Sequence, residues 1–397
     1  MTHGLLASLN ILDFSTLLPG PYASLLLADL GANVVRVEAP DRPDLARLTP
    51  PFDGDTSAWH AVLNRNKRSL ALNLKAPGAA DMVKRLVQTY DIVLEQFRPG
   101  VMDRLGVGYA ALREANPRLI YVALTGYGQT GPYRDRAGHD INYLALAGVS
   151  SHLGRREGGP VPLGVQVADV GAGSLLAVMG LLSAEIHRRV TGEGQFVDVS
   201  MFDGAVAWNT LALAHYFASG QNPAPEEQWL NGGSFYDYYE TADGRYLAVG
   251  SLEPKFWTGF CRAIGRSDLI NPGFSLAPAN QRYVKAEIQA AIRAKTWAEW
   301  SAIFAAEDVC VEPVLTVAEM LEHPQTQARG LVAAVPRGDG TTRQQAAAPV
   351  KFSAESAVYR HIGKKLGADS VAVLAEIGFS ADEIAAFVAQ GTVAVSE

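Results

Sequence analysis

The feature that most constrains the fold is the alternation of short apolar runs with helical patterns in the first part of the chain. Strand-like segments are expected at residues 10–14, 33–38, 91–94 and 118–124, with helices between them at 22–30, 79–89 and 109–115. Strands joined through helices form a parallel sheet whose two faces are both covered. The chain is therefore predicted to be an α/β protein with a doubly wound, Rossmann-like sheet.

A second domain is expected after the longest apolar helical pattern, which covers residues 170–190. The loop-like composition SGQNPAP at residues 219–225 marks the boundary. The strand and helix patterns that follow it end near residue 330. The pattern thus predicts a large domain over residues 1–220 and a smaller α+β domain over 221–330.

Composition excludes several classes of protein. The formal net charge is −7 and no Lys/Arg tract is present, so no nucleic-acid surface is expected. Cys261 and Cys310 lack both CxxC spacing and a nearby His pair, so neither a disulfide framework nor a metal site is predicted. The N-terminus does not resemble a signal peptide, and no apolar run is judged long enough to span a bilayer. We expect a cytoplasmic protein without membrane association.

The motif Gly126-Tyr127-Gly128-Gln129-Thr130-Gly131 matches GxGxxG and follows a predicted strand. A dinucleotide site also needs this turn to open a helix, with an acidic residue about 20 positions later. Here PYRDRAG follows without an apolar face, and the expected acidic position falls in LALAGVSS. We therefore reject a nicotinamide site.

Two segments carry candidate chemistry: GHDINY around His139, and DVGAGS beginning at Asp169. Each has a structural interpretation, since Asp is a preferred helix cap and a His beside Asp140 can form a hydrogen-bonded pair. Each also has a catalytic one. A His can give or take a proton, and the amides of a helix beginning near residues 170–173 could hold an oxyanion. The residues alone leave both open.

A third segment runs from Asn231 through an aromatic stretch to Glu253-Pro254. The aromatic residues are typical of strand packing. Glu253 before proline is typical of a helix start.

An ordered series of segments then points to a family. The series contains ILDFSTLLPGPYASLLLADLGANVVRVEAP, NKRSLALNLK, LEQFRPGVMDRLG, RLIYVALTGYGQTGP, AGHDINYLALAG, QVADVGAGS, TGEGQFVDVSMFDG and FYDYYETADGRYLAVGSLEP. In this order they resemble the family III CoA-transferases and, within them, the α-methylacyl-CoA racemases.

The resemblance implies an interlocked homodimer whose small domain is inserted in the large one, so that residues 331–397 return to the large domain. It also implies a racemase or epimerase of 2-methylacyl-CoA thioesters, an isomerase of fatty acid metabolism. His139 and Asp169 match its two proton carriers. CoA enters as part of the acyl-CoA substrate, and no separate cofactor is needed.

Other site residues follow from the same resemblance. Glu253 and Arg104 match residues that support activity or cofactor placement. The CoA contacts fall on Arg36, Leu72, Asn73, Leu74, Lys75, Gln96, Phe97, Arg104, Gly138, Asp140, Ile141, Asn142 and Tyr143. The chain departs from its relatives at Ala39, where they often carry an Arg; Arg36, Arg42 or Arg47 could substitute.

Two alternatives stay open. Family transferases keep the aspartate as a nucleophile that forms an acyl-aspartyl anhydride, and they generally lack the His. Leu18, where a transferase branch has glutamine, and the spacing of His139 and Asp169 both favour a racemase. The other alternative is a CoA-binding protein without chemistry. The sequence leaves the acyl group open: fatty, steroid-like and aromatic chains fit it equally.

Overall fold

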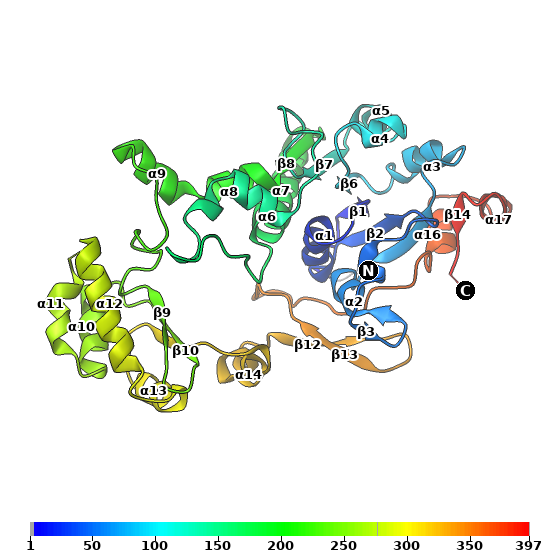
Figure 1. Cartoon of the computed structure of the whole chain (residues 1–397). Helices are drawn as coiled ribbons and strands as arrows, with labels where there is room; N and C mark the ends of the chain where they lie inside the picture. Colours follow the sequence, from blue (N-terminus) through cyan, green and yellow to red (C-terminus); the bar gives the residue numbers. More distant parts are fainter. Residues whose placement is uncertain (1–3, 276, 397) are drawn as a thin grey trace. The chain divides into compact units, whose positions relative to one another are not determined.

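The computed structural model describes residues 4–275 and 277–396, which form two units (Figure 1). Unit 1 contains the residues up to Ala147, Leu163–Trp208 and those from Gln327 onward. Unit 2 contains Gly148–Pro162 and Asn209–Thr326. Unit 2 thus includes two stretches, 148–162 and 209–220, that were expected in the large domain.

A seven-stranded sheet lies at the centre of unit 1. Its strands in spatial order are β14 (Val393–Ala394), β5 (Arg68–Leu72), β2 (Asn33–Glu38), β1 (Asn10–Asp13), β6 (Ile92–Glu95), β7 (Ile120–Thr125) and β8 (Phe196–Ser200). Neighbouring strands are parallel, except that β14 pairs antiparallel with β5. Apart from β14, the chain builds outward from β1 to one side and then to the other, which is the Rossmann strand order. The predicted parallel α/β sheet is confirmed.

Helices cover both faces of this sheet because its strands are apolar on both faces. Leu12, Val35 and Val93 belong to the cluster that packs with helices α3, α5 and α16, while their neighbours Ile11 and Val34 are equally buried. The helices of unit 1 are α1 (Pro19–Asp29), α2 (Ala58–Leu63), α3 (Ala79–Leu86), α4 (Val101–Arg104), α5 (Tyr109–Ala115), α6 (Asp140–Leu146), α7 (Leu176–Thr191), α8 (Met201–Trp208), α16 (Ser370–Glu376) and α17 (Ala381–Ala389). Two short hairpins, β3 (Phe52–Asp53) with β4 (Thr56–Ser57) and β12 (Val332–Pro336) with β13 (Thr342–Ala346), complete the unit.

The long helix differs from the expectation in one respect. A π-helical segment, Ala168–Leu175, continues directly into α7. Together they form a helix of 24 residues whose most apolar window has a mean hydropathy of 1.4, so it is long and apolar enough to cross a membrane by these two criteria. By these two criteria the expectation that no run reaches that length is wrong. Of that window 44% is buried inside the fold, and the core helix of a soluble protein meets the same criteria.

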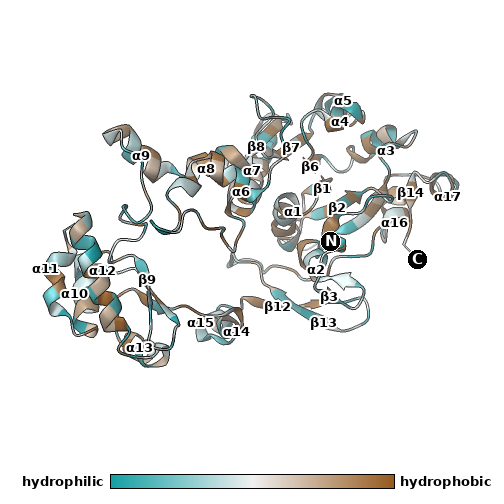
Figure 2. Ribbon diagram, in the orientation of Figure 1, coloured by the Kyte–Doolittle hydropathy of each residue, from teal (hydrophilic) through white to brown (hydrophobic). Residues whose placement is uncertain are grey.

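Unit 2 has its own core around a three-stranded antiparallel sheet. Its strands lie in the order β11 (Val311–Pro313), β10 (Tyr246–Val249) and β9 (Asp237–Glu240). Its helices are α9 (Thr210–Ser219), α10 (Pro254–Ala263), α11 (Ile270–Gly273), α12 (Pro278–Ile292), α13 (Trp297–Phe304) and α14 (Val317–Glu322), with α15 (Pro324–Ala328) at the boundary. Helix α12 carries both hydrophilic and hydrophobic residues (Figure 2) and buries Val284, Ile288 and Ile292, which are spaced four apart on one face.

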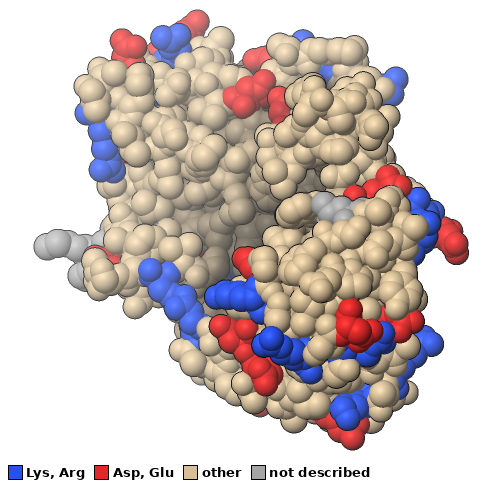
Figure 3. Space-filling view, turned by 90° about the vertical axis from the view of Figure 1, so that its left-hand side faces the viewer, with Lys and Arg blue, Asp and Glu red and all other residues tan. Residues whose placement is uncertain are grey.

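On the face of the molecule drawn in Figure 3, acidic and basic side chains lie interspersed beside large uncharged areas. A charged ligand on that face would therefore interact with individual charged side chains, because no large area of the described residues on that face carries charge of a single sign.

Candidate active site

His139 stands at the start of helix α6. After β7 ends, the glycine-rich loop leads to this helix, which begins only at Asp140, so the GxGxxG turn does not open a helix. The backbone N–H of His139 donates to the side-chain oxygen of Asn142 at 3.0 Å, which fixes the chain direction at the cap. The His139 side chain is exposed, so the imidazole is accessible for proton transfer.

Asp140, the next residue, ties this helix start to the segment that carries Asp169. Its Oδ1 atom accepts the backbone N–H of Ala168 at 2.7 Å and of Asp169 at 3.0 Å. These amides belong to the beginning of the π-helical segment and would otherwise lack an intrahelical acceptor. The two segments that the sequence singled out are thus joined by direct hydrogen bonds.

The Asp169 carboxyl has a strongly altered affinity for protons. Partial burial raises its pKa from 3.8 to about 7, and the nearby negative charge of Asp140 adds to the effect. The group therefore changes protonation near neutral pH, as a general acid or base requires. It also lies in a π-helical segment, a rare geometry that is frequent at functional sites.

Aromatic packing fixes the loop before His139. The Tyr143 hydroxyl donates to the carbonyl of Gly138 at 2.6 Å, and its ring packs edge-on against Tyr127 with centroids 5.2 Å apart. A Cβ atom at Gly138 would lie 2.6 Å from Cε1 of Tyr143, so only glycine fits. Burial, with a smaller effect of the Asp169 charge, raises the pKa of Tyr143, which therefore stays a neutral hydrogen-bond donor.

Some of the backbone N–H groups at the start of the helix that carries Asp169, which were expected to bind an oxyanion, already donate to acceptors within the protein. The N–H of Val170 donates to the carbonyl of Gln166 at 2.9 Å, and the amides of Ala168 and Asp169 bind Asp140. The expectation that an enolate oxygen binds from residue 170 onward is therefore wrong at Val170, because the helix begins earlier than its apolar pattern.

Gln96 and Phe97 lie where the strand order reverses, between β1 and β6. Gln96 Oε1 accepts the N–H of Gly20, in the first turn of α1, at 2.9 Å. The N–H of Phe97 donates to Glu95 at 2.7 Å, and burial raises the pKa of Glu95 to about 8. Ligands of doubly wound sheets bind at this switch point, so the position suits the predicted CoA contacts.

The other predicted contacts are dispersed. Leu72 is the last residue of β5 and is fully buried, whereas Lys75, three positions later, is exposed. Arg104 is exposed at the end of α4. Ile141 is exposed in the first turn of α6. Glu253 occupies the N-cap position of α10 in unit 2 and is exposed, without a capping hydrogen bond from its side chain; its part in catalysis stays a prediction.

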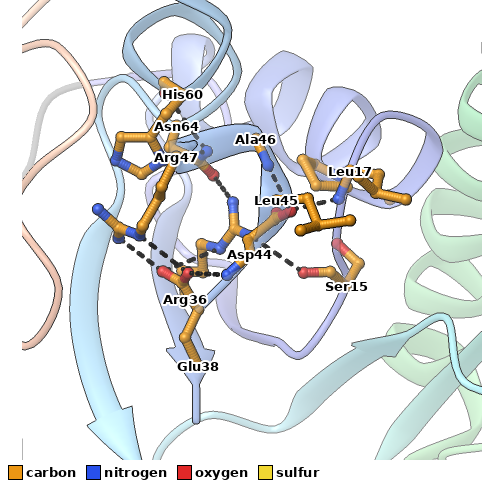
Figure 4. A network of polar contacts seen from close by, with 12 residues as sticks. Ser15, Leu17, Arg36, Glu38, Asp44, Leu45, Ala46, Arg47, His60 and Asn64 are labelled. Carbon is orange, nitrogen blue, oxygen red and sulfur yellow. Dashed lines mark hydrogen bonds and ion pairs between the residues drawn. The ribbon is translucent and has the colours of Figure 1, made fainter. Parts of the chain in front are cut away.

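Arg36, predicted to contact CoA, lies in a buried polar network (Figure 4). It is 1% exposed, and its guanidinium binds the side chains of Asp44 and Asn64 and pairs with Glu38 at 3.3 Å. These carboxylates hold its charge inside the fold.

The two other basic residues that could contact CoA, Arg47 and Arg42, differ in whether a carboxylate of the protein binds them. Arg47 forms two contacts with Glu38, at 3.0 and 2.6 Å. Arg42 is exposed and lies at the end of a turn in which its N–H donates to the carbonyl of Ala39 at 3.4 Å. Arg42 thus presents a cation beside Ala39, the position where the family resemblance implied an arginine.

The sequence did not reveal the bonds from Asp140 to the segment of Asp169, since Asp140 was expected to contact CoA or to pair with His139. A carboxylate that follows His139 at a helix start could have been read as a cap for a second helix, but its partner lies in another segment. Among the described residues, no group of three or more His, Cys, Asp or Glu side chains is placed to hold a metal ion.

A Rossmann-ordered sheet, a glutamine at its switch point and a partly buried carboxyl with a raised pKa are features found in α/β enzymes. The chain belongs to the CoA-transferase family III, which it matches over residues 6–370. It is 37% identical over 389 residues to the human α-methylacyl-CoA racemase, covering 96% of this chain and 95% of that protein.

Transferases are also among its relatives. The chain is 34% identical over 384 residues to a succinate–glutarate CoA-transferase of Agrobacterium fabrum, covering 94% and 95%. The crystal structure of a CaiB/BaiF family protein from Brucella suis matches with a TM-score of 0.82 and 28% identity, covering 94% of this chain and 99% of that chain. The family resemblance is confirmed.

Proposed function

We propose that this protein interconverts the stereoisomers of 2-methylacyl-CoA thioesters by removing and returning the α-proton. The observation that carries the proposal is the bond from the backbone N–H of Asp169 to Asp140, the neighbour of His139. This bond links the backbone segments that carry His139 and Asp169, the two side chains that we propose move the proton.

The chemistry follows from the substrate. The thioester carbonyl makes the α-hydrogen acidic enough to be removed, which leaves an enolate. A carboxyl with a pKa of about 7 can take a proton in one direction and return it in the other. With His139 on the opposite face of the carbon, removal on one side and return on the other inverts the centre. Glu253 is proposed as a supporting residue.

The CoA part is proposed to lie along the strand ends, against Gln96 and Phe97. We assign Arg42 as the basic residue toward its phosphates, because Arg36 and Arg47 are bound to carboxylates of the protein. CoA is then part of the substrate, and the proposed reaction needs no further cofactor.

A homodimer, with interlocked chains, is also proposed. Helix α7 exposes Met179, Ile186 and Val190 at 60%, 66% and 84%. Large apolar side chains gathered along one helix are typical of a surface that another protein chain covers, and we assign this one to a second copy.

CoA transfer between carboxylic acids is the second candidate, because the relatives include transferases. In that reaction Asp169 attacks as a carboxylate. A pKa near 7 leaves a large fraction of the group protonated at neutral pH, which suits proton transfer better than nucleophilic attack.

The test is solvent-deuterium exchange at the α-carbon of several 2-methylacyl-CoA thioesters, with a free acid added to detect transfer. His139→Ala and Asp169→Ala should each reduce exchange and epimerisation by a factor on the order of 100 or more. His187→Ala on α7 and Asp81→Ala on α3 remove exposed groups of the same types and should act like the wild type.

Normal epimerisation by Asp169→Ala would refute the assignment. CoA appearing on the free acid, together with hydroxylamine trapping of an acyl-enzyme, would establish the transferase instead.

A further inference from the structure

Ser174 is fully buried, and the proposed reaction does not use it. Its hydroxyl donates to the carbonyl of Pro19 at 2.6 Å and lies 3.1 Å from the carbonyl oxygen of Asp169. One hydroxyl thus contacts the first residue of helix α1 and the residue that carries the reactive carboxyl. The shorter contact is the one between the two helices.

The first turn of α1 is itself held by the switch point. The residue after Pro19 is Gly20, whose N–H donates to Gln96. A Cβ atom at Gly20 would lie 2.1 Å from Cβ of Ser15 and 2.8 Å from Oε1 of Gln96. The backbone at Gly20 is therefore packed directly against both side chains. A shift of Gln96 would therefore move Pro19.

The loop that precedes α1 is also held in place, by a hydrogen bond from Leu17 to Asp44. The N–H of Leu17, a residue with a φ of 60°, donates to Asp44 at 2.9 Å. A non-glycine residue keeps that backbone angle only where its surroundings impose it. These contacts hold the loop in one conformation, and the Ser174 hydroxyl is a hydrogen bond between the first turn of α1 and the segment of Asp169.

We propose that Ser174 is a positioning residue that couples the binding of the nucleotide part of CoA near Gln96 to the placement of the Asp169 carboxyl. The inference rests on the proposed function for its substrate and deepens it. Binding energy from a remote part of a substrate raises kcat when it aligns the reacting groups. Here the path is Gln96, the first turn of α1, the Ser174 hydroxyl and the π-helical segment.

The experiment compares a 2-methylacyl-CoA thioester with the same acyl group on pantetheine, which lacks the nucleotide. Ser174→Ala and the near-isosteric Ser174→Cys should lower kcat for the CoA thioester about tenfold, the effect of one lost hydrogen bond, with KM nearly unchanged. They should leave kcat for the pantetheine thioester unchanged. Ser57→Ala is the matched control, because Ser57 is also buried and its hydroxyl also donates to a backbone carbonyl, that of Thr49, at 2.6 Å.

Equal losses with both thioesters would overturn the proposal, since a structural role alone would affect both. A second readout does not depend on activity. Binding of CoA should slow amide hydrogen exchange in residues 168–176 of the wild type and of Ser57→Ala, but not of Ser174→Ala. If the wild type neither exchanges the α-hydrogen nor transfers CoA, the proposed function fails. Amide hydrogen exchange in residues 168–176 would still test whether CoA binding is coupled to the segment of Asp169. Protection that persists in Ser174→Ala, or is absent from the wild type, refutes it.

Discussion

Replacing Asp169 by asparagine should stabilise the protein at alkaline pH and leave its stability unchanged near pH 4. The carboxyl has a pKa of about 7 in the folded protein, against an ordinary value of 3.8. Between these values the folded state holds a proton that the unfolded state has released. Stability therefore falls as the pH rises from about 4 to 7, and below that window both states are neutral and the penalty vanishes. Asparagine has the same shape and does not ionise, so it escapes the penalty.

The magnitude follows from the shift. A rise from 3.8 to about 7 would correspond to about 4 kcal/mol if the whole shift acted on folding. Asp169 is partly exposed, and solvent screens its charge. We therefore expect a gain of about 1–2 kcal/mol for Asp169→Asn at pH 8.

Urea unfolding followed by tryptophan fluorescence, from pH 4 to pH 8.5, measures this difference. Asp81→Asn, which removes an exposed carboxylate from α3, is the control for the loss of one charge. A stability difference between Asp169→Asn and the wild type that is the same at both ends of the pH range would refute the reasoning.

Three further outcomes are expected. Gly138→Ala places a Cβ atom 2.6 Å from Tyr143, so it should destabilise the fold by about 1–3 kcal/mol in thermal unfolding and abolish exchange at the α-carbon. Lys67→Met leaves the buried Asp13 without its ion pair, now 3.4 Å long, and should cost about 3–5 kcal/mol in urea unfolding, part of which Asp13→Asn should restore. Arg42→Ala should raise KM for the CoA thioester about tenfold at low salt with little change in kcat, and added salt should shrink the difference; a KM equal to that of the wild type would remove Arg42 from the phosphate contact.

Local patterns predicted strands β1, β2, β6 and β7 well because nearly all of their residues are buried, on both faces of the sheet. They predicted no strand at β5 or β14. The strand expected at residues 33–38 is β2 itself, and that at 118–124 became β7, Ile120–Thr125. The helix expected at 22–30 starts earlier, at Pro19, because proline and small residues are tolerated in a first turn.

The site was harder to predict because its contacts are non-local. The sequence singled out His139 and Asp169 but could not show that Asp140 bonds to the backbone of the second segment. The π-helical geometry leaves no mark in the apolar pattern. The burial of Arg36 could not be predicted for a related reason: its partners Asp44 and Asn64 follow in other elements, and only folding brings their side chains around it.

The pairing of β14 with β5 has a consequence for synthesis. β5 leaves the ribosome long before β14, so the backbone edge of β5 must wait, open to solvent and to other chains, until the strand that covers it is made. Because the predicted CoA contacts follow β5 directly, and the N–H of Asn73 donates to the carbonyl of Thr392 at 2.9 Å, the nascent chain would acquire this part of its ligand site only at the end of translation.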